Sequence, residues 1–350
     1  MHFSKVLFVF SLVSSFLFHG CNESSTSGMP SYSGRVGEIV VVSTKAQWES
    51  EIGNAVRFVF LEEQYGLPQD EPYFKLISTT EDKFRSIFKT YRNIFVVTID
   101  TNLYSEPKLL IRKDVYAKGQ HIVEARAANA EDFNSLMDAK KGELIKYFNK
   151  TELERLYRRN SNYVEKQLVA KIKNKFGIEF NPHKGGVLTK EAENAFWIRW
   201  EYEQNKGGMK HQISQGLFVY SYPYLYEKQF SDSSILAQRD FMLEQFIPGP
   251  NEGSYMTTEY RYVPPSIEQT VYQGEFAKEI RGLWKLEKGF MGGPMLSLAM
   301  YDKLNNRMVV ANGYVFAPEF DKREHLREVE AMVKSIKFTE MSLTDTSATD

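Results

Sequence analysis

The chain has 350 residues, of which 42% are hydrophobic and 25% are charged, a composition typical of a folded protein and not of a disordered one. Its 44 Lys and Arg residues balance 45 Asp and Glu residues, which argues against a basic protein built to hold nucleic acid. This length suits one large domain or two of average size, so the number of domains has to come from patterning along the chain.

The first twenty residues have the features of an export signal. Lys5 supplies a positive charge, residues 6–18 form an apolar stretch that is too short to span a bilayer, and Gly20 precedes Cys21. Cys21 is the only cysteine, so no disulfide can form within the chain. The pattern resembles a bacterial lipoprotein signal, in which residues 1–20 are removed and Cys21 carries a lipid anchor. An ordinary secretory signal with an incidental cysteine is the alternative.

Polar segments flank the part of the chain that we expect to fold. Residues 21–34 are rich in Ser, Gly and Thr, which predicts a flexible tether, and residues 339–350 form a similar polar tail. Between them the patterning predicts an α+β or mixed α/β fold with two sheet-and-helix lobes. We expect an N-terminal lobe at 35–150, a helical connector at 151–178 and a C-terminal lobe at 179–338.

In the first lobe, runs of apolar and β-branched residues predict strands. These strands lie at 38–43, 93–99, 109–115 and 120–127. Helical periodicity predicts helices at 48–62, 78–91 and 131–148. The prediction of the second helix depends on Ser78 and Glu81, which have the spacing of a capping box.

The connector and the second lobe begin with another capping box. Thr151 and Glu154 predict the start of an amphipathic helix that runs through Phe176. Alternating apolar and polar side chains at 196–203 predict an antiparallel strand with one solvent-exposed face. Further strands are expected at 217–226, 254–262, 279–287, 295–301 and 307–316, and helices at 234–245 and 321–336. A short similarity between 111–116 and 280–284 raises the hypothesis of a divergent internal duplication.

No complete catalytic or metal-binding motif is present. The histidines beyond the signal, at positions 121, 183, 211 and 325, have no metal-ligand spacing, so the sequence predicts no metal site and no cofactor. Nucleophile-elbow, phosphate-loop and dinucleotide-binding motifs are also missing. Asp70 and Glu71 are the best carboxylate candidates for acid–base chemistry, because Pro68 and Pro72 stiffen the loop that presents them.

Two further stretches have more than one interpretation. Residues 140–175 hold eleven basic and four acidic residues, which suits either a solvated helix face or a surface turned toward anionic lipid. Tyr220, Tyr222, Tyr224 and Tyr226 alternate along an extended segment. They would line a sugar- or peptide-binding surface, or pack within the core.

Five separated elements of the sequence together resemble a known family. They are residues 66–72 (GLPQDEP), 92–93 (RN), 248–256 with Pro248-Gly249 and EGSYM, 291–294 (MGGP), and 316–323 with Phe316-Ala317-Pro318 and Lys322-Arg323. These elements resemble the Bacteroidota lipoproteins grouped as domain of unknown function 4837. The resemblance implies an envelope lipoprotein of a Gram-negative bacterium, with no established activity. Its elements supply the candidate binding residues Gln69, Asp70, Glu71, Arg92, Asn93, Glu252 and Tyr255.

The leading functional hypothesis is a non-catalytic envelope protein that binds an unknown ligand or protein partner. Its membrane contact would be the lipid on Cys21, with the protein on the outer membrane facing the periplasm or displayed on the surface. The alternative hypothesis is an envelope hydrolase that acts on a cell-wall or glycan substrate with carboxylates from loops, such as Asp70, Glu71 and Glu252.

Overall fold

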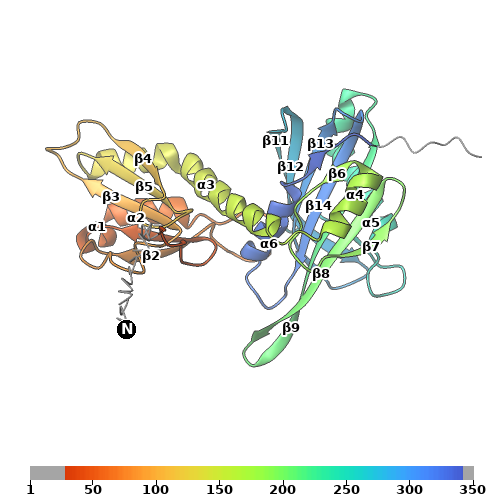
Figure 1. Cartoon of the computed structure of the whole chain (residues 1–350), viewed down its shortest axis with the longest axis horizontal. Helices are drawn as coiled ribbons and strands as arrows, with labels where there is room; N and C mark the ends of the chain where they lie inside the picture. Colours follow the sequence, from red (N-terminus) through yellow and green to blue (C-terminus); the bar gives the residue numbers. More distant parts are fainter. Residues whose placement is uncertain (1–27, 342–350) are drawn as a thin grey trace, which may run out of the picture.

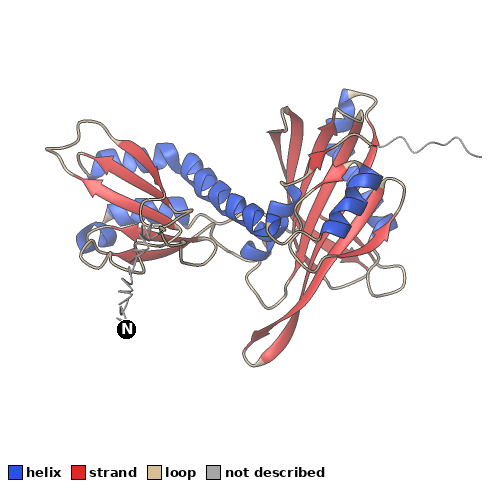
Figure 2. Cartoon of the chain, viewed as in Figure 1, coloured by secondary structure: helices blue, strands red, loops and turns tan. Residues whose placement is uncertain are grey.

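The computed structural model describes residues 28–341, which form two lobes joined by a long helix (Figures 1 and 2). Each lobe combines a β-sheet with helices, so the predicted α+β class with two sheet-and-helix lobes is confirmed. The predicted signal peptide, Cys21, the first part of the predicted tether and residues 342–350 of the predicted tail lie outside the described residues.

The first lobe holds a five-stranded sheet in the order β2-β1-β3-β5-β4. Four strands are parallel and the edge strand β4 is antiparallel. The strands are β1 (Glu38–Val42), β2 (Lys75–Thr79), β3 (Asn93–Ile99), β4 (Lys108–Lys113) and β5 (His121–Ala127). The predicted strands at 38–43, 93–99, 109–115 and 120–127 are therefore confirmed, and they are the runs of β-branched residues that suit a buried sheet.

Helices cover only one face of this sheet. The short α1 (Lys45–Glu49) and α2 (Glu51–Phe60) correspond to the helix predicted at 48–62, and α2 packs on the sheet together with α3 (Ala130–Ser161). The opposite face is covered by Phe84, Phe88 and Tyr91 from the irregular segment 80–91. The sheet therefore has a helical side and a loop side.

The helix predicted at 78–91 is wrong. Ser78 lies inside strand β2, where its backbone follows the sheet register, so it does not cap a helix. The following residues form turns, and Ser86 has a φ of 45°, which a right-handed helix does not allow. The aromatic residues that gave this segment a helical spacing are used to cover the sheet.

The helix α3 passes from the first lobe to the second as one continuous element of 32 residues (Figure 1). The prediction of a new helix starting at Thr151 is wrong, because the Thr151 hydroxyl donates to the carbonyl oxygen of Phe148 within α3 at 2.8 Å. The real break comes later, between Asn162 and Glu165, and α4 (Lys166–Phe176) follows. Within residues 28–341, no helix combines the length and the apolar character needed to cross a membrane.

The second lobe is built on an antiparallel sheet of eight strands. The path runs β10-β12-β13-β14-β9-β8-β7, and β11 pairs with β12 beside it. The strands are β7 (Val187–Glu191), β8 (Ala195–Lys206), β9 (Met209–Pro223), β10 (Tyr255–Glu259), β11 (Ser266–Tyr272), β12 (Glu275–Glu287), β13 (Gly292–Asp302) and β14 (Arg307–Phe316). Six of them were predicted, whereas the exposed edge strands β7 and β11 were not.

Helices lie on both faces of this second sheet. On one face, α4 and α6 (Arg323–Val333) pack against the apolar side chains of β8, β9, β13 and β14. On the other face lie the 3-10 turn η1 (Glu227–Phe230) and α5 (Asp232–Phe246). A two-stranded sheet of β6 (Ile178–Glu179) and β15 (Lys337–Phe338), which was not predicted, ties the end of the lobe to its start. The helices predicted at 234–245 and 321–336 are confirmed as α5 and α6.

The two sheets have different topologies. The first is mainly parallel and the second is antiparallel throughout. The short sequence similarity falls on the exposed edge strand β4 in one lobe and on the interior strand β12 in the other. The structure therefore gives no support to an internal duplication.

Candidate functional site

The predicted residues Gln69 and Glu71 lie at the contact between the two lobes. Glu71 is buried, and its two carboxylate oxygens accept hydrogen bonds from the backbone N–H groups of Lys322 and Arg323, at 2.7 Å and 2.8 Å. The Lys322 ammonium donates to the Gln69 side-chain oxygen at 2.7 Å. A carboxylate of the first lobe thus caps the N-terminus of α6 in the second lobe, where the helix dipole favours negative charge.

Arg327 reinforces the same contact from the next turn of α6. This buried guanidinium donates to the carbonyl oxygen of Tyr73 at 2.9 Å and to the Asn149 side chain at 3.0 Å, and it pairs with Glu324. The neighbouring Asp70, by contrast, is exposed. Gln69 and Glu71 therefore hold the lobes together, and Asp70 is left facing solvent.

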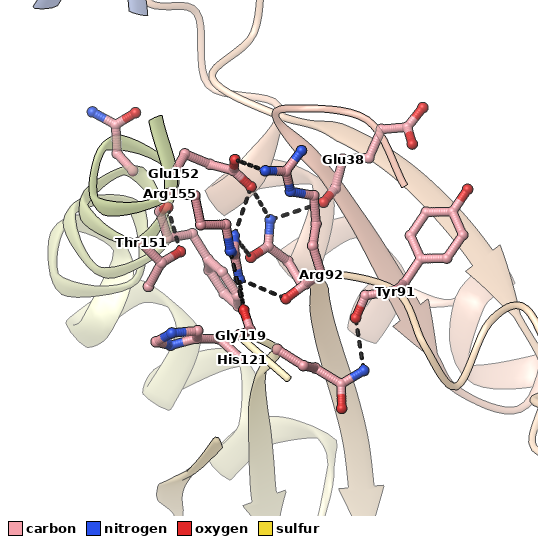
Figure 3. Close-up of polar contacts among 12 residues, drawn as sticks. Glu38, Tyr91, Arg92, Gly119, His121, Thr151, Glu152 and Arg155 are labelled. Atoms are coloured by element: carbon pink, nitrogen blue, oxygen red, sulfur yellow. Dashed lines mark hydrogen bonds and ion pairs between the residues drawn. The ribbon is translucent and has the colours of Figure 1, made fainter. Parts of the chain in front are cut away.

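The predicted residues Arg92 and Asn93 belong to a buried polar network in the first lobe (Figure 3). Glu152 of α3 is fully buried and pairs with Arg92 at 3.1 Å and with Arg155 at 2.9 Å, and it accepts a hydrogen bond from Asn93 at 2.6 Å. Both guanidinium groups also lie over the ring of Tyr32, at 4.9 Å and 5.0 Å from its centroid.

The backbone of the sheet completes this network. Arg155 donates to the carbonyl oxygens of Arg92 and Gly119 at 2.8 Å and 3.0 Å, so α3 is fastened to the ends of two strands at once. Figure 3 shows Arg92 and Arg155 converging on Glu152 from the sheet and from the helix. Burial, helped by the positive charge of Arg155, lowers the pKa of the nearby His121 to about 4.

The position of the network argues for a structural role. Asn93 and His121 are the first residues of β3 and β5, so the network lies at the amino ends of the parallel strands. Ligand sites in open parallel sheets lie beyond the carboxyl ends. The charged groups of the network are buried and paired with one another, although the Arg92 Nε and Glu152 Oε2 atoms have no hydrogen-bond partner. We therefore assign Arg92 and Asn93 to the attachment of α3.

Glu252 and Tyr255 lie in the second lobe, away from the predicted carboxylates of the first. Glu252 is exposed in a turn, and Tyr255 opens β10 opposite Glu287. None of the five principal cavities found among residues 28–341 is lined by Asp70, Glu71 or Glu252. Within residues 28–341, Glu252 is therefore not brought together with Asp70 or Glu71 in one of these cavities, as a glycan hydrolase acting with these carboxylates would need.

A different cavity, which we call the aromatic groove, lies on the α5 face of the second sheet. It begins where α5 ends at Phe246 and has a volume of about 500 Å³. Its lining residues come from six strands and two loops. They are Thr189, Trp197, Arg199, Glu201, Gln212, Ser214, Ile247, Pro248, Gly249, Pro250, Met256, Trp284, Leu286, Met291, Tyr314 and Phe316.

Aromatic rings from three strands form the floor of this groove. The Trp197 indole N–H donates to the Tyr314 hydroxyl at 3.0 Å, and the Trp284 and Tyr314 rings meet edge to face at 5.6 Å. Gly216 makes room for the floor, because a Cβ atom there would lie 2.1 Å from the Tyr314 ring. Gly293 has a similar role, since its Cβ would lie 2.1 Å from the carbonyl oxygen of Val315. The floor is therefore fixed in place before any ligand arrives.

The two sides of the groove differ in polarity. The side formed by β7, β8 and β9 carries Thr189, Arg199, Glu201, Gln212 and Ser214. The opposite side, from the α5–β10 loop, β10, β12 and the β12–β13 turn, carries isoleucine, proline, methionine, leucine and tryptophan side chains. A cavity with one apolar and one polar wall suits a molecule that has an apolar part and a polar part.

The groove is lined by few groups that are common in catalysis. Among the described residues that line the groove, none is a histidine or cysteine, and the carboxylate nearest to Ser214 in the strand pairing, Glu201, is ion-paired with Arg199. Burial raises the pKa of Tyr314, which keeps its hydroxyl protonated. Arg199 pairs with Glu201 and lies over the Trp197 ring.

Three of the five family-like sequence elements meet at this groove. Pro248 and Met256 come from one element, Met291 from another and Phe316 from a third. The remaining second-lobe pair, Lys322-Arg323, contacts the first-lobe element at residues 66–72 across the lobe junction. Four of the five elements thus gather at the groove and the junction, whereas Arg92-Asn93 lies apart from both in the buried network of the first lobe.

A second cavity of about 660 Å³ lies where α3 ends against β8 and α6. Here the structure joins two histidines that the sequence left isolated. His183 Nε2 is 2.9 Å from the Gln215 side-chain oxygen, and the Gln215 amide donates to the His325 carbonyl oxygen at 3.0 Å. Burial lowers the pKa of both histidines. Within residues 28–341, no group of three or more potential ligands is placed to hold a metal ion.

Two family models match separate parts of the chain. Residues 165–335 match the model described as Domain of unknown function (DUF4837), and residues 32–161 match Domain of unknown function (DUF8532). The family expected from the sequence is therefore supported for the region from α4 to α6, whereas the first lobe and α3 match a different model. The resembling elements at 66–72 and 92–93 therefore lie outside the region that matches the expected family.

Comparisons with curated proteins and with solved structures do not identify a function. No curated protein matches the sequence. Among solved structures, the Ran-binding protein Mog1p of Saccharomyces cerevisiae is similar with a TM-score of 0.30 and 11% sequence identity. The similarity covers 47% of this chain and 91% of that one. A similarity of this size carries no argument about fold or function.

Proposed function

We propose that this chain of two domains of unknown function is a membrane-anchored envelope lipoprotein that binds an amphipathic ligand in the aromatic groove. The proposed anchor is a lipid on Cys21, and its support is the export-signal pattern of residues 1–20. We place the protein on the outer membrane, facing the periplasm. The ligand is a molecule with an apolar body and a polar head.

The aromatic groove carries this proposal. Its volume of about 500 Å³ lies in the range of small-molecule sites. The apolar body would lie on Trp284, Met291 and Phe316, where burying apolar surface drives binding. The polar head would meet Arg199, Gln212 or Ser214, which offer both hydrogen-bond donors and acceptors.

Binding without catalysis follows from the same lining. A hydrolase needs an activated nucleophile, a pair of carboxylates or a bound metal ion at the ligand. The groove supplies one ion-paired carboxylate, Glu201, and three hydroxyls, those of Thr189, Ser214 and Tyr314, with no histidine among its lining residues. These groups can orient a ligand, and they give no route to bond cleavage.

A binding experiment with a mouth-blocking variant tests the proposal. The Cys21→Ser chain is purified without detergent and titrated with anilinonaphthalene sulfonate, which joins an apolar ring system to an anionic head. The Gln212→Trp variant places a large side chain across the mouth of the groove, and we expect it to weaken binding of the probe at least tenfold. Native mass spectrometry of the unblocked protein is expected to show a co-purifying amphiphile.

The matched control lies on the same hairpin. Gln204 is exposed on β8 but, by the alternation of side chains along a strand, faces away from the groove. We expect Gln204→Trp to bind the probe as the unsubstituted protein does. Equal binding by both variants would show that the probe enters elsewhere, and the proposed ligand site would be abandoned.

A further inference from the structure

The surface where the chain enters the first lobe is built from three segments, residues 29–35, 81–91 and 113–118, which we call the entry surface. The backbone joins them directly. The N–H of Ser33 donates to the carbonyl oxygen of Thr90, and the N–H of Lys118 donates to that of Pro30, both at 2.8 Å. Any tether that leaves residue 28 therefore starts from this surface.

The entry surface is basic, although the whole chain is nearly neutral. It carries six basic residues, all exposed, against three acidic ones, Glu81, Asp82 and Asp114. The six are Arg35, Lys83, Arg85, Lys89, Lys113 and Lys118. None of these six forms an ion pair with another residue in the described range 28–341.

The basic stretch at 140–175 differs in this respect. Seven of its eleven basic residues pair with a carboxylate. For example, Lys141 pairs with Glu62 and Arg159 pairs with Glu328. Their charge is already compensated within the protein, so this stretch has a weaker attraction for an external anionic surface than its composition suggests.

Apolar side chains are exposed on the same entry surface. The side chain of Ile87 is 62% exposed, that of Met29 is 44% exposed and that of Tyr116 is 38% exposed. The Lys89 ammonium lies 5.3 Å from the Tyr116 ring centroid. Exposed apolar groups among unpaired basic groups are typical of a protein surface that lies against lipid headgroups.

We propose that the entry surface rests on the anionic headgroups of the bilayer in which Cys21 is anchored. This inference depends on the proposed lipid anchor and adds the side of the protein that meets the membrane. Six residues lie between Cys21 and Gly28, so the seven steps from one to the other span at most about 25 Å. The first lobe must therefore stay close to the bilayer, and attraction between Lys or Arg and anionic lipid acts at such short range.

Spin labels on the lipidated chain test the inference. Once Cys21 is acylated, a single introduced cysteine is the only free thiol. Ile87→Cys places a label on the entry surface, and Lys210→Cys places one on the β8–β9 hairpin. Each labelled protein is bound to vesicles that contain phosphatidylglycerol or to vesicles of phosphatidylcholine alone. In the anionic vesicles we expect the label at 87 to be far more accessible to oxygen than to a water-soluble nickel complex. The label at 210 is expected to remain aqueous.

Charge reversal separates lipid contact from general proximity. The triple substitution of Lys83, Arg85 and Lys89 to Glu should return the label at 87 to an aqueous environment. The same substitution of the exposed Lys146, Lys150 and Lys166 should leave it at the headgroups. An aqueous label at 87 in the unreversed, acylated protein would overturn this inference alone. Intact mass is measured first, because a Cys21 without lipid would overturn the anchor itself and this inference with it.

Discussion

Replacing Glu71 by Gln tests whether the predicted loop carboxylates hold the lobes together. Glutamine keeps the shape of the side chain and removes its charge. One amide oxygen can still accept from Lys322 or Arg323, while the amide NH₂ group faces the other backbone N–H. The substitution therefore removes one hydrogen bond and leaves a donor without an acceptor at a buried helix end.

The expected loss of stability follows from these contacts. A hydrogen bond to a charged group contributes about 1.5–3 kcal/mol, and a charge at a helix N-terminus adds about 0.3–1 kcal/mol. Because Glu71 is buried, solvent screening reduces these values little. We expect Glu71→Gln to lower the free energy of unfolding by about 2–3 kcal/mol. The exposed neighbour provides the control, and Asp70→Asn should change it by less than about 0.5 kcal/mol.

Urea unfolding followed by far-UV circular dichroism measures the difference, and amide hydrogen exchange locates it. Exchange should increase in the first turn of α6 and in residues 62–74, while the sheets of both lobes stay protected. If Glu71→Gln and Asp70→Asn unfold at the same urea concentration and α6 exchanges unchanged, the assignment of Glu71 to the lobe junction is incorrect.

Two further predictions concern the buried network and the nearby His121. Glu152→Gln leaves Arg92 and Arg155 as buried cations without a counter-charge, so urea unfolding should show a free energy of unfolding lower by about 3–5 kcal/mol. The exposed Glu154→Gln is the control, and equal stability of the two variants would contradict the prediction. The pKa of His121 is about 4 in the folded chain and ordinarily about 6.5, so between these values the unfolded chain binds more protons and stability falls as the pH falls. Urea midpoints measured from pH 7 to pH 4 should decrease less steeply in His121→Gln, and an unchanged slope would show that His121 does not carry this dependence.

Local sequence determined many of the individual elements. The valines of β1 and the β-branched run of β3 are buried strands because their side chains fit a covered sheet. Alternation at 196–203 located β8, although its expected solvent-exposed face is partly covered because Trp197 is buried, and helical spacing located α5 and α6. These features depend on neighbours in sequence, which is why they could be predicted.

Capping boxes were less dependable, because the same spacing occurs where no helix starts. Ser78 has a capping partner three residues later, yet strand pairing with β1 draws it into the sheet. Thr151 has the same signal, yet the packing of Glu152 and Arg155 on the sheet continues α3 through it. In both cases tertiary contacts outweighed a contribution of about 1 kcal/mol from a cap.

The candidate sites were the least predictable part. Sequence chose Glu71 and Arg92 for their chemistry, and the structure uses both to fasten elements together. The aromatic groove had no sequence motif, because Trp197, Trp284 and Tyr314 are separated by dozens of residues. Some signal was available, since three of the family-like elements pointed to segments that border it.

By itself, the sequence determined most of the elements of this protein and its two-lobed α+β class. Only the tertiary structure decided which carboxylates are buried in ion pairs, which basic residues remain unpaired and where aromatic rings from separate strands form a floor. The reason is physical: periodicity and caps act over a few residues, whereas burial, charge pairing and cavities depend on contacts between segments that only the folded chain brings together.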